Sequence, residues 1–472
     1  MAEMDDLKKL EEEARKLEKQ REELLKKIQQ QQSLQEKEKA SSNAKEEKEF
    51  LLAKNSDIFR LITRTLSLMD QKIVVHSCKT AYIYAKMLTY TRKFTKKQIA
   101  QYTVIGLLHD LGEFKIQNDT RRNVQTGNNA WSHSIFSYLY IRNFSPLGEL
   151  GNVVLYHHVD PIKFEEVLTT ERLEAAILCL ADRMERMIGE YDSNDSIKTL
   201  FSRFAKREER CEVMEEAMAI ALNAMREYNI ATRITSGEYE EELYQMLDNL
   251  ELTEGEKKKY LELLMYAFDF QTDEAFLDTL RTISISEQIG EVMLVSEYER
   301  KILSYGTLLY DIGKFAMPLG ILRKPGKLSN AEMLIIRSHP AYTEYLLEGF
   351  FDQEIINVAA RHHERMDGSG YPYGVQGEEL TLCERILAVA DVVSALSADR
   401  SYRKALPKAK ILEILLKDVE NNKLCPHVVN ALVKKYNIIM SAASFNVQRA
   451  SKAFVVETAI AYNQLYARLK EM

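Results

Sequence analysis

From Phe50 onward, apolar residues recur at steps of three and four positions. The segments Asp57–Met69, Gln98–Leu108 and Leu173–Ile188 place apolar side chains at i, i+3, i+4 and i+7, which is the repeat of an amphipathic helix. Alternation of apolar and polar residues, the pattern of a half-buried strand, is scarce, and the chain has only eight prolines. The sequence therefore predicts an all-α fold built from helical bundles.

The first 50 residues contain no proline or glycine and consist almost entirely of helix formers. Apolar residues recur at alternating steps of three and four positions, at Leu7, Leu10, Ala14, Leu17, Leu24 and Ile28. Arg21 occupies the one seam position that is not apolar. This pattern predicts a short parallel coiled coil over residues 1–50 that would pair two copies of the chain as a homodimer. The alternative is a solvated single helix or a disordered charged tail, because three heptads are marginal on their own.

The chain repeats itself. LLHDLGEF at residues 107–114 matches LLYDIGKF at 308–315, and three shorter landmarks follow in the same order in both halves. These are the pairs Ser132-His133 and Ser338-His339, His157-His158 and His362-His363, and Ala181-Asp182 and Ala390-Asp391. The sequence therefore predicts two homologous helical domains, near 57–190 and 275–440, joined by a helical linker over 191–274 and followed by a helical tail over 441–472.

Composition narrows the class of protein. The chain has 472 residues, 46% of them hydrophobic and 29% charged, which suits a globular protein of two to three domains. Its net charge of −7 gives no overall basic footprint for a nucleic-acid polymer. No apolar run is long enough to span a membrane, and the charged N-terminus is unlike a signal peptide. We expect a cytoplasmic protein whose five scattered cysteines are reduced core thiols.

Histidine and aspartate carry the strongest chemical signal. Eight of the nine histidines fall into the pattern of the two repeats, and only His427 is left over. The first repeat offers a full set of candidate ligands: His76, His109, Asp110, His133, His157, His158 and Asp182. Any one of these histidines alone is more often a capped or core imidazole, but the set together suits a centre of two divalent metal ions such as Mn or Fe. Structural zinc fits poorly, because it takes four ligands and usually includes sulfur.

The pattern H…HD…H…HH…D resembles the HD superfamily of metal-dependent phosphohydrolases. In the second repeat, HHERMDGSGYP at 362–372 is similar to the signature of HD-GYP domains, together with DIGK at 311–314, KPGKL at 324–328, SHP at 338–340 and DRSYR at 399–403. The resemblance covers about 150 residues in family order. HD-GYP proteins are typically bacterial phosphodiesterases that hydrolyse the signalling molecule cyclic di-GMP with two or three metal ions. The resemblance therefore implies a metal-dependent phosphodiesterase acting on a cyclic dinucleotide or a related phosphoester.

The resemblance also implies a role for each matched residue. In the first repeat, one metal ion would take His76, His109, Asp110 and Asp182, and the other would take His133, His157 and His158, with Asp110 bridging the two. In the second repeat the ligands would be Asp311, His339, His362, His363 and Asp391. Asp110 and Lys314 are the catalytic candidates, and the candidates for substrate binding are Lys314, Gly370, Tyr371, Pro372, Arg400 and Arg403. The lysine and the two arginines match phosphate oxygens as donors.

Each repeat departs from the family pattern. In the second, Tyr310 replaces the histidine of the HD pair, and the position of the first histidine falls near Asp278 in a stretch without histidine. A phenol is a poor ligand at neutral pH. In the first, the histidine pair is followed by no GYP, and Glu113 stands where the other copy has Lys314, a reversal of charge beside a site expected to receive phosphate. Arg183 and Arg186 remain as sources of positive charge.

Three functional hypotheses follow. The first is a phosphodiesterase whose metal chemistry lies in residues 57–190. The second is a signalling module whose HD-GYP-like copy binds cyclic di-GMP without hydrolysing it. The third is a scaffold in which both copies are inactive. Within the enzyme class, a nucleotide monophosphate or a guanosine polyphosphate is an alternative substrate for the first copy.

Overall fold

A computed structural model of the chain describes residues 54–118, 131–159, 163, 170–188, 212–268, 275–399 and 404–470. Helices make up almost all of the regular structure of these residues, which include no strand and one isolated β-bridge, between Asp367 and Gln376. The predicted all-α class is confirmed. The predicted coiled coil of residues 1–50 lies outside the described residues.

The first copy is built on a helical hairpin with helices on either side of it. Its elements are α2 (Asn55–Leu66), α3 (Gln71–Thr91), α4 (Lys96–Leu108), α5 (Glu113–Asn118), α6 (Trp131–Phe144), η1 (Gly148–Gly151), α7 (Asn152–Leu155) and α9 (Arg172–Ile188). Side-chain caps fix where the two hairpin helices begin. The Asp70 carboxylate accepts hydrogen bonds from the first turn of α3, and Thr95 and Gln98 form a capping box at α4.

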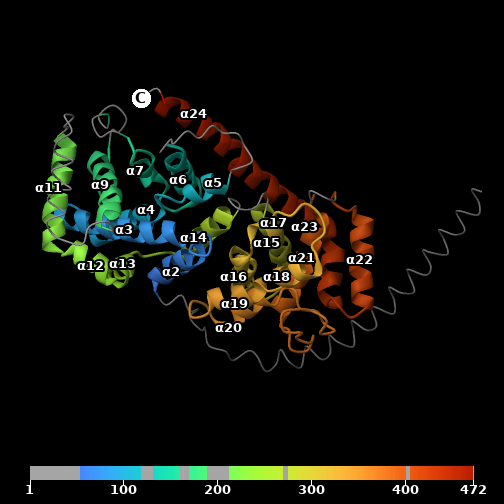
Figure 1. Ribbon diagram of the computed structural model, residues 1–472. Coiled ribbons are helices and arrows are strands. Elements are labelled where there is room, and N and C mark those ends of the chain that lie inside the picture. The colour runs from blue at the N-terminus through green and yellow to red at the C-terminus, as the bar shows by residue number, and fades with distance from the viewer. Residues whose placement is uncertain are drawn as a thin grey trace, which may run out of the picture.

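Within the predicted linker, the described residues 212–268 form four helices: α11 (Glu212–Glu227), α12 (Ile230–Ser236), α13 (Tyr239–Leu247) and α14 (Glu254–Phe268). Helix α11 packs on α3 and α9, and α13 packs on α2, α3 and α4 (Figure 1). Much of this stretch therefore completes the core of the first copy instead of spanning a gap between domains. Helix α14 contacts α2 and α6 on one side and α15 and α16 on the other.

The second copy repeats the order of the first. Its elements are α15 (Ala275–Val292), α16 (Glu297–Leu309), η3 (Ile312–Ala316), α17 (Leu319–Leu322), α18 (Asn330–Ile336), α19 (His339–Leu347), α20 (Gln353–Ala360), α21 (Leu382–Ser397), α22 (Lys408–Glu420) and α23 (Pro426–Ser451). Ser296 and Glu299 form a capping box at α16, as Thr95 and Gln98 do at α4. The two hairpins thus begin their second helix with the same device.

Aromatic side chains join the two copies through α14. Tyr266 of α14 stacks on Phe144 of α6, with ring centroids 3.8 Å apart, and its ring also contacts that of Phe276 of α15 in a tilted arrangement, at 3.9 Å. A second connection runs from α2, where the Arg64 guanidinium donates to the Tyr345 carbonyl at 2.8 Å. The two copies therefore share one continuous apolar core.

The predicted helical tail returns to the first copy. After the π-helical turn η4 (Lys452–Glu457), helix α24 (Thr458–Lys470) runs back towards α6 (Figure 1). Tyr462 of α24 stacks on Phe136 of α6 at 4.4 Å, and its hydroxyl lies 3.1 Å from the Ser132 hydroxyl. The end of the described chain thus packs against the helix that carries His133.

Two expectations about composition can be compared with these residues. The described cysteines, Cys78, Cys179, Cys383 and Cys425, are all buried free thiols, as predicted. No described helix combines the length and the hydropathy needed to cross a membrane.

Candidate metal centre

Two groups of candidate ligands meet in the first copy, and Asp110 belongs to both. One group consists of His76, His109, Asp110 and Asp182, and the other of Asp110, His133, His157 and His158. Within each group, the ligand atoms lie within 4.8 Å of one another. All seven predicted ligands of the first repeat are therefore brought together.

The carboxylate of Asp110 faces both groups, one oxygen towards each. Its Oδ2 lies 3.4 Å from His76 Nε2 and 3.4 Å from His109 Nε2. Its Oδ1 lies 3.4 Å from His133 Nε2 and 3.8 Å from His157 Nε2. A carboxylate placed in this way is suited to bridge two divalent ions.

The turn after α4 makes this placement possible. His109 is the C-cap of α4, and Asp110 and Leu111 lead at once into Gly112, whose backbone passes against α6. A side chain at Gly112 would place its Cβ 2.2 Å from the carbonyl oxygen of His133, so only glycine allows this approach. The amide of Gly112 also donates to the Ser137 hydroxyl at 2.8 Å. This contact sets α6, and with it His133, at the correct distance from Asp110.

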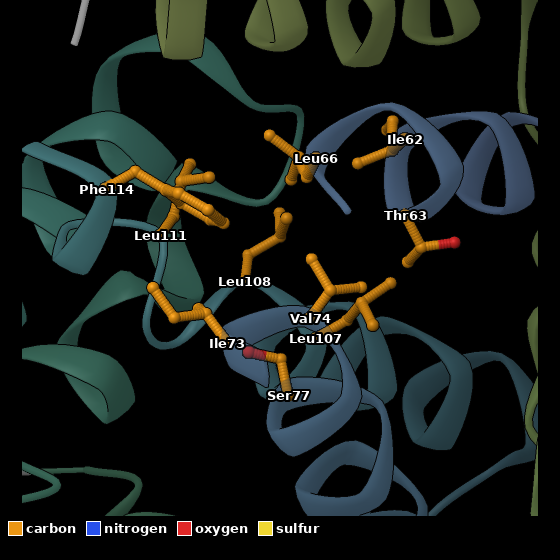
Figure 2. A pocket seen from close by; sticks show the side chains of 10 residues that line it. All are labelled: Ile62, Thr63, Leu66, Ile73, Val74, Ser77, Leu107, Leu108, Leu111 and Phe114. Atoms are coloured by element: carbon orange, nitrogen blue, oxygen red, sulfur yellow. The ribbon is translucent and has the colours of Figure 1, made fainter. Parts of the chain in front are cut away.

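A packed apolar layer joins the helices that carry His76 and His109. It is lined by residues of α2, α3, α4 and α5 and of the turn between α4 and α5 (Figure 2): Ile62, Thr63, Leu66, Ile73, Val74, Ser77, Leu107, Leu108, Leu111 and Phe114. The cavity inside it encloses only ≈ 10 Å³, far less than a small-molecule site needs. Its function is to hold the helices of His76 and His109 in place.

Several polar atoms in the first copy are buried without any hydrogen-bond partner. They include Nε2 of His109 and His157 and Oδ1 of Asp110. Buried polar atoms are almost always paired, because an unpaired one costs about 1–3 kcal/mol. Two ring nitrogens and a carboxylate oxygen that face one another unpaired fit divalent metal ions, which would be their common partner.

Electrostatics divides the histidines into two kinds. Burial alone would lower the pKa of His76, but Asp110, Asp182 and Glu185 raise it to about 11. Burial, together with the neighbouring His133, lowers the pKa of His158 to about 4, and burial also lowers the pKa of His157. His157 and His158 are therefore neutral donors at pH 7, whereas His76 holds a proton that a metal ion would displace.

The two key carboxylates are ionised. Burial opposes this, but the imidazoles of His109, His76, His133 and His157 hold the pKa of Asp110 well below its usual range. The pKa of Asp182 is lowered against burial by His109 and His76. The centre thus offers negative charge where a cation would bind.

The second copy keeps one ligand group. His339, His362 and His363 lie together, and Asp311 Oδ1 is 3.3 Å from His339 Nε2 and 3.9 Å from His362 Nε2. Asp391 lies at the edge of the group, with Oδ2 3.5 Å from His363 Nδ1. The other oxygen of Asp311 accepts from Lys314 Nζ at 2.6 Å, whereas the second oxygen of Asp110 faces His76 and His109.

Tyr310 occupies the position of the histidine that is missing from the HD pair of the second copy. Its hydroxyl, fully buried, donates to Thr282 Oγ1 at 3.3 Å, and burial raises its pKa further above the ordinary value. Asp278, where the count from the family pattern falls, pairs with Arg281 at 2.6 Å, one helical turn before Thr282. The second copy therefore has a neutral, buried phenol where the HD pair of the first copy has His109.

The GYP loop is organised by the glutamate that follows the histidine pair. The buried Glu364 accepts backbone hydrogen bonds from Tyr373 at 2.7 Å, Gly374 at 3.1 Å and Val375 at 3.1 Å. A Cβ at Gly370 would come within 2.4 Å of the Glu364 Cα, so the loop needs glycine there. The Tyr371 ring then packs on the His363 ring, with ring centroids 4.6 Å apart. The Arg337 guanidinium lies over the Tyr371 ring, 5.1 Å from its centroid.

Two of the predicted residues are not described by the structure, and the contacts that two glutamates make with the ligand histidines were not predicted. Arg400 and Arg403 are outside the described residues. Arg186 donates to Asp182 Oδ1 at 3.1 Å, at the rim of the first centre. Glu185 contacts His76 Nδ1 at 2.6 Å, and Glu113, expected to face phosphate, instead contacts His133 Nδ1 at 2.9 Å. The three-residue spacing of Asp182 and Glu185 on one helix was the available signal for Glu185.

Comparison with known proteins supports the repeat. Two family profiles, each described as an HD domain, match residues 73–187 and 265–428. The 3'3'-cGAMP-specific phosphodiesterase 1 of Vibrio cholerae is 26% identical over 401 residues, which cover 80% of this chain and 90% of that protein. The 3'3'-cGAMP-specific phosphodiesterase 3 of the same organism is 37% identical over 187 residues, which cover 38% of this chain and 40% of that protein.

Two further proteins are similar. The cyclic di-GMP phosphodiesterase response regulator RpfG of Xanthomonas campestris pv. campestris is 38% identical over 167 residues, which cover 34% of this chain and 43% of that protein. The crystal structure of a cyclic GMP-AMP specific phosphodiesterase of V. cholerae, V-cGAP3, aligns over 80% of this chain and 98% of that chain, with 19% identity and a TM-score of 0.45.

Proposed function

Because this chain belongs to the HD superfamily and carries two HD domains, we propose that it is a metal-dependent phosphodiesterase whose first copy hydrolyses a cyclic dinucleotide. The relatives named above are cyclic dinucleotide phosphodiesterases of bacterial signalling. One observation carries the assignment to the first copy: both oxygens of Asp110 face a complete group of ligands, and the described residues of the second copy form one such group.

The residues of the first copy suit this chemistry. Two divalent ions, Mn or Fe by the choice of ligands, would supply positive charge to the phosphodiester and lower the pKa of a water molecule. Asp110 sets the distance between the two positions, and His157 and His158 donate as neutral imidazoles. Arg186, 58% exposed beside Asp182, is the candidate to contact a phosphate oxygen.

A panel of phosphoesters tests this function. The purified chain with Mn²⁺ should convert cyclic di-GMP or 3'3'-cGAMP to a linear dinucleotide, as measured by chromatography, and EDTA should abolish the reaction. A nucleotide monophosphate and a guanosine polyphosphate are the matched alternatives. Hydrolysis of one of these, with both cyclic dinucleotides left intact, would contradict the proposed substrate.

A second function is favoured for the C-terminal copy. Lys314 occupies one oxygen of Asp311, and Tyr310, hydrogen-bonded to Thr282, takes the place of one ligand histidine, while the GYP loop stays ordered by Glu364. These features favour a site that binds the dinucleotide with at most one metal ion and does not hydrolyse it. In this role Lys314 and Tyr371 would contact the ligand, with Gly370 and Pro372 shaping the loop.

Binding without turnover is the expected result for this copy. Calorimetry with cyclic di-GMP should detect binding to a chain made inactive in the first copy, and Lys314→Ala should weaken that binding about 10-fold or more, because a hydrogen bond to a charged group contributes about 1.5–3 kcal/mol. Lys410→Ala, on the exposed face of α22, is the control. Equal affinity in both variants would argue against a receptor role for Lys314.

Pairing of two chains stays a prediction. We propose that residues 1–50 form a parallel coiled coil, and sedimentation of the full chain against a chain lacking these residues tests it. A monomer in both cases would contradict the proposal.

A further inference from the structure

In each candidate ligand histidine, one ring nitrogen faces the ligand group and the other faces away from it. The histidines differ in the group that contacts this second nitrogen. In His109, His157, His339 and His362, Nδ1 contacts the carbonyl oxygen three residues earlier, at 2.5–2.8 Å. These are uncharged contacts that every helix end offers. His76 and His133 are held by glutamates.

Glu185 holds His76. Its Oε2 lies 2.6 Å from His76 Nδ1, and its Oε1 lies 3.6 Å from Lys79 Nζ. The Glu185 side chain is 11% exposed and stands on α9, one turn after Asp182, whose Oδ1 lies 3.0 Å from Nε2 of the same imidazole. One helix therefore supplies both the neighbouring ligand and the carboxylate behind His76.

Glu113 holds His133. Its Oε1 lies 2.9 Å from His133 Nδ1. In the second copy the corresponding residue, Lys314, contacts Asp311, and His339 turns to the carbonyl of Ile336 at 2.7 Å. The residue at this position after the HD or YD pair thus contacts the histidine of the ligand group in the first copy and the aspartate in the second.

We propose that Glu185 and Glu113 are positioning residues, one for each metal position of the first copy. A carboxylate that accepts from Nδ1–H fixes the tautomer, aims the Nε2 lone pair at the ion and makes the imidazole a stronger donor. His76 belongs to one ligand group and His133 to the other, so each ion has one histidine held by a glutamate. The inference rests on the two metal positions of the proposed function.

The test is a Mn²⁺ titration of the full chain without substrate. The binding isotherm gives the affinity for each ion, and electron paramagnetic resonance detects bound ions and pairs of coupled ions. Glu185→Gln and Glu113→Gln keep the shape of the side chain and remove its charge. Each should weaken one ion about 10- to 100-fold and leave the other near its wild-type affinity. Glu149→Gln, exposed on η1, is the matched control and should bind as wild type does.

Double-mutant cycles separate positioning from a general structural effect. Glu185→Gln should add no further loss to His76→Ala but should add its full loss to His133→Ala, and Glu113→Gln should show the reverse. Losses that add fully in all four combinations, or wild-type affinity in both glutamine variants, would overturn the inference while the two-metal centre stands. A wild-type chain that binds no ion in the first copy would overturn the proposed function as well.

Discussion

Asp110→Asn is expected to lower the turnover of a cyclic dinucleotide by at least about 10³-fold, because charge stabilisation at both metal positions is lost together. The side chain is buried, and its two oxygens face two different ligand groups at 3.4 Å. An amide of the same shape keeps one acceptor oxygen, loses the negative charge and turns an N–H donor towards imidazole nitrogens that must bind a cation. Turnover by chromatography and metal content by mass spectrometry measure the two effects.

Asp311→Asn is the matched variant in the second copy. There one oxygen of the aspartate is already taken by Lys314, and the ligand group is incomplete. This change should reduce metal content by at most one ion per chain and leave turnover within about threefold, a barrier change below about 1 kcal/mol. Full activity in Asp110→Asn would refute the bridging role of Asp110.

Gly112→Ala is expected to lower the free energy of unfolding by about 3 kcal/mol, because a well-packed backbone contact cannot absorb an added methyl group. The new Cβ would lie 2.2 Å from the His133 carbonyl oxygen and 2.9 Å from the Phe136 Cβ. Helix α6 must shift to relieve the overlap, and the ion held by His133 should therefore bind more weakly. Urea denaturation and Mn²⁺ titration are the measurements.

Two other glycines serve as controls for that change. Gly313→Ala meets the His339 carbonyl oxygen at 1.9 Å, so it should destabilise the chain to a similar degree but leave metal binding in the first copy intact. Gly255→Ala meets nothing within 4 Å and should be nearly neutral. A Gly112→Ala chain as stable as wild type would contradict the close approach of the HD turn to α6.

The sequence predicted the fold because the signals for it are local. Helical periodicity, caps such as Thr95 and Ser296, and the repeated HD or YD turn are each contained within a few residues. The all-α fold, the two HD domains and the phosphodiesterase class are confirmed. The metal roles of individual residues stay predictions, which the arrangement of the ligand groups supports.

Contacts between distant segments were beyond the sequence argument. Nothing in the local pattern indicates that Tyr462 would stack on Phe136, or that Tyr266 would join the two copies. The interpretation of Glu113 as a charge facing phosphate assumed that it points as Lys314 does, but a shorter acidic side chain finds the Nδ1 of His133 instead. Counting back to Asp278 located α15 but fell one helical turn before Thr282, the residue that contacts Tyr310.

The most direct measurement compares metal content and turnover of a cyclic dinucleotide in His109→Ala and His362→Ala, side by side with the wild-type chain. Both histidines are fully buried, and each faces the aspartate of its own copy, His109 facing Asp110 and His362 facing Asp311. The account predicts that His109→Ala loses turnover together with metal from the first copy, and that His362→Ala keeps turnover while losing any ion of the second copy. Turnover that survives in His109→Ala and disappears in His362→Ala would contradict it.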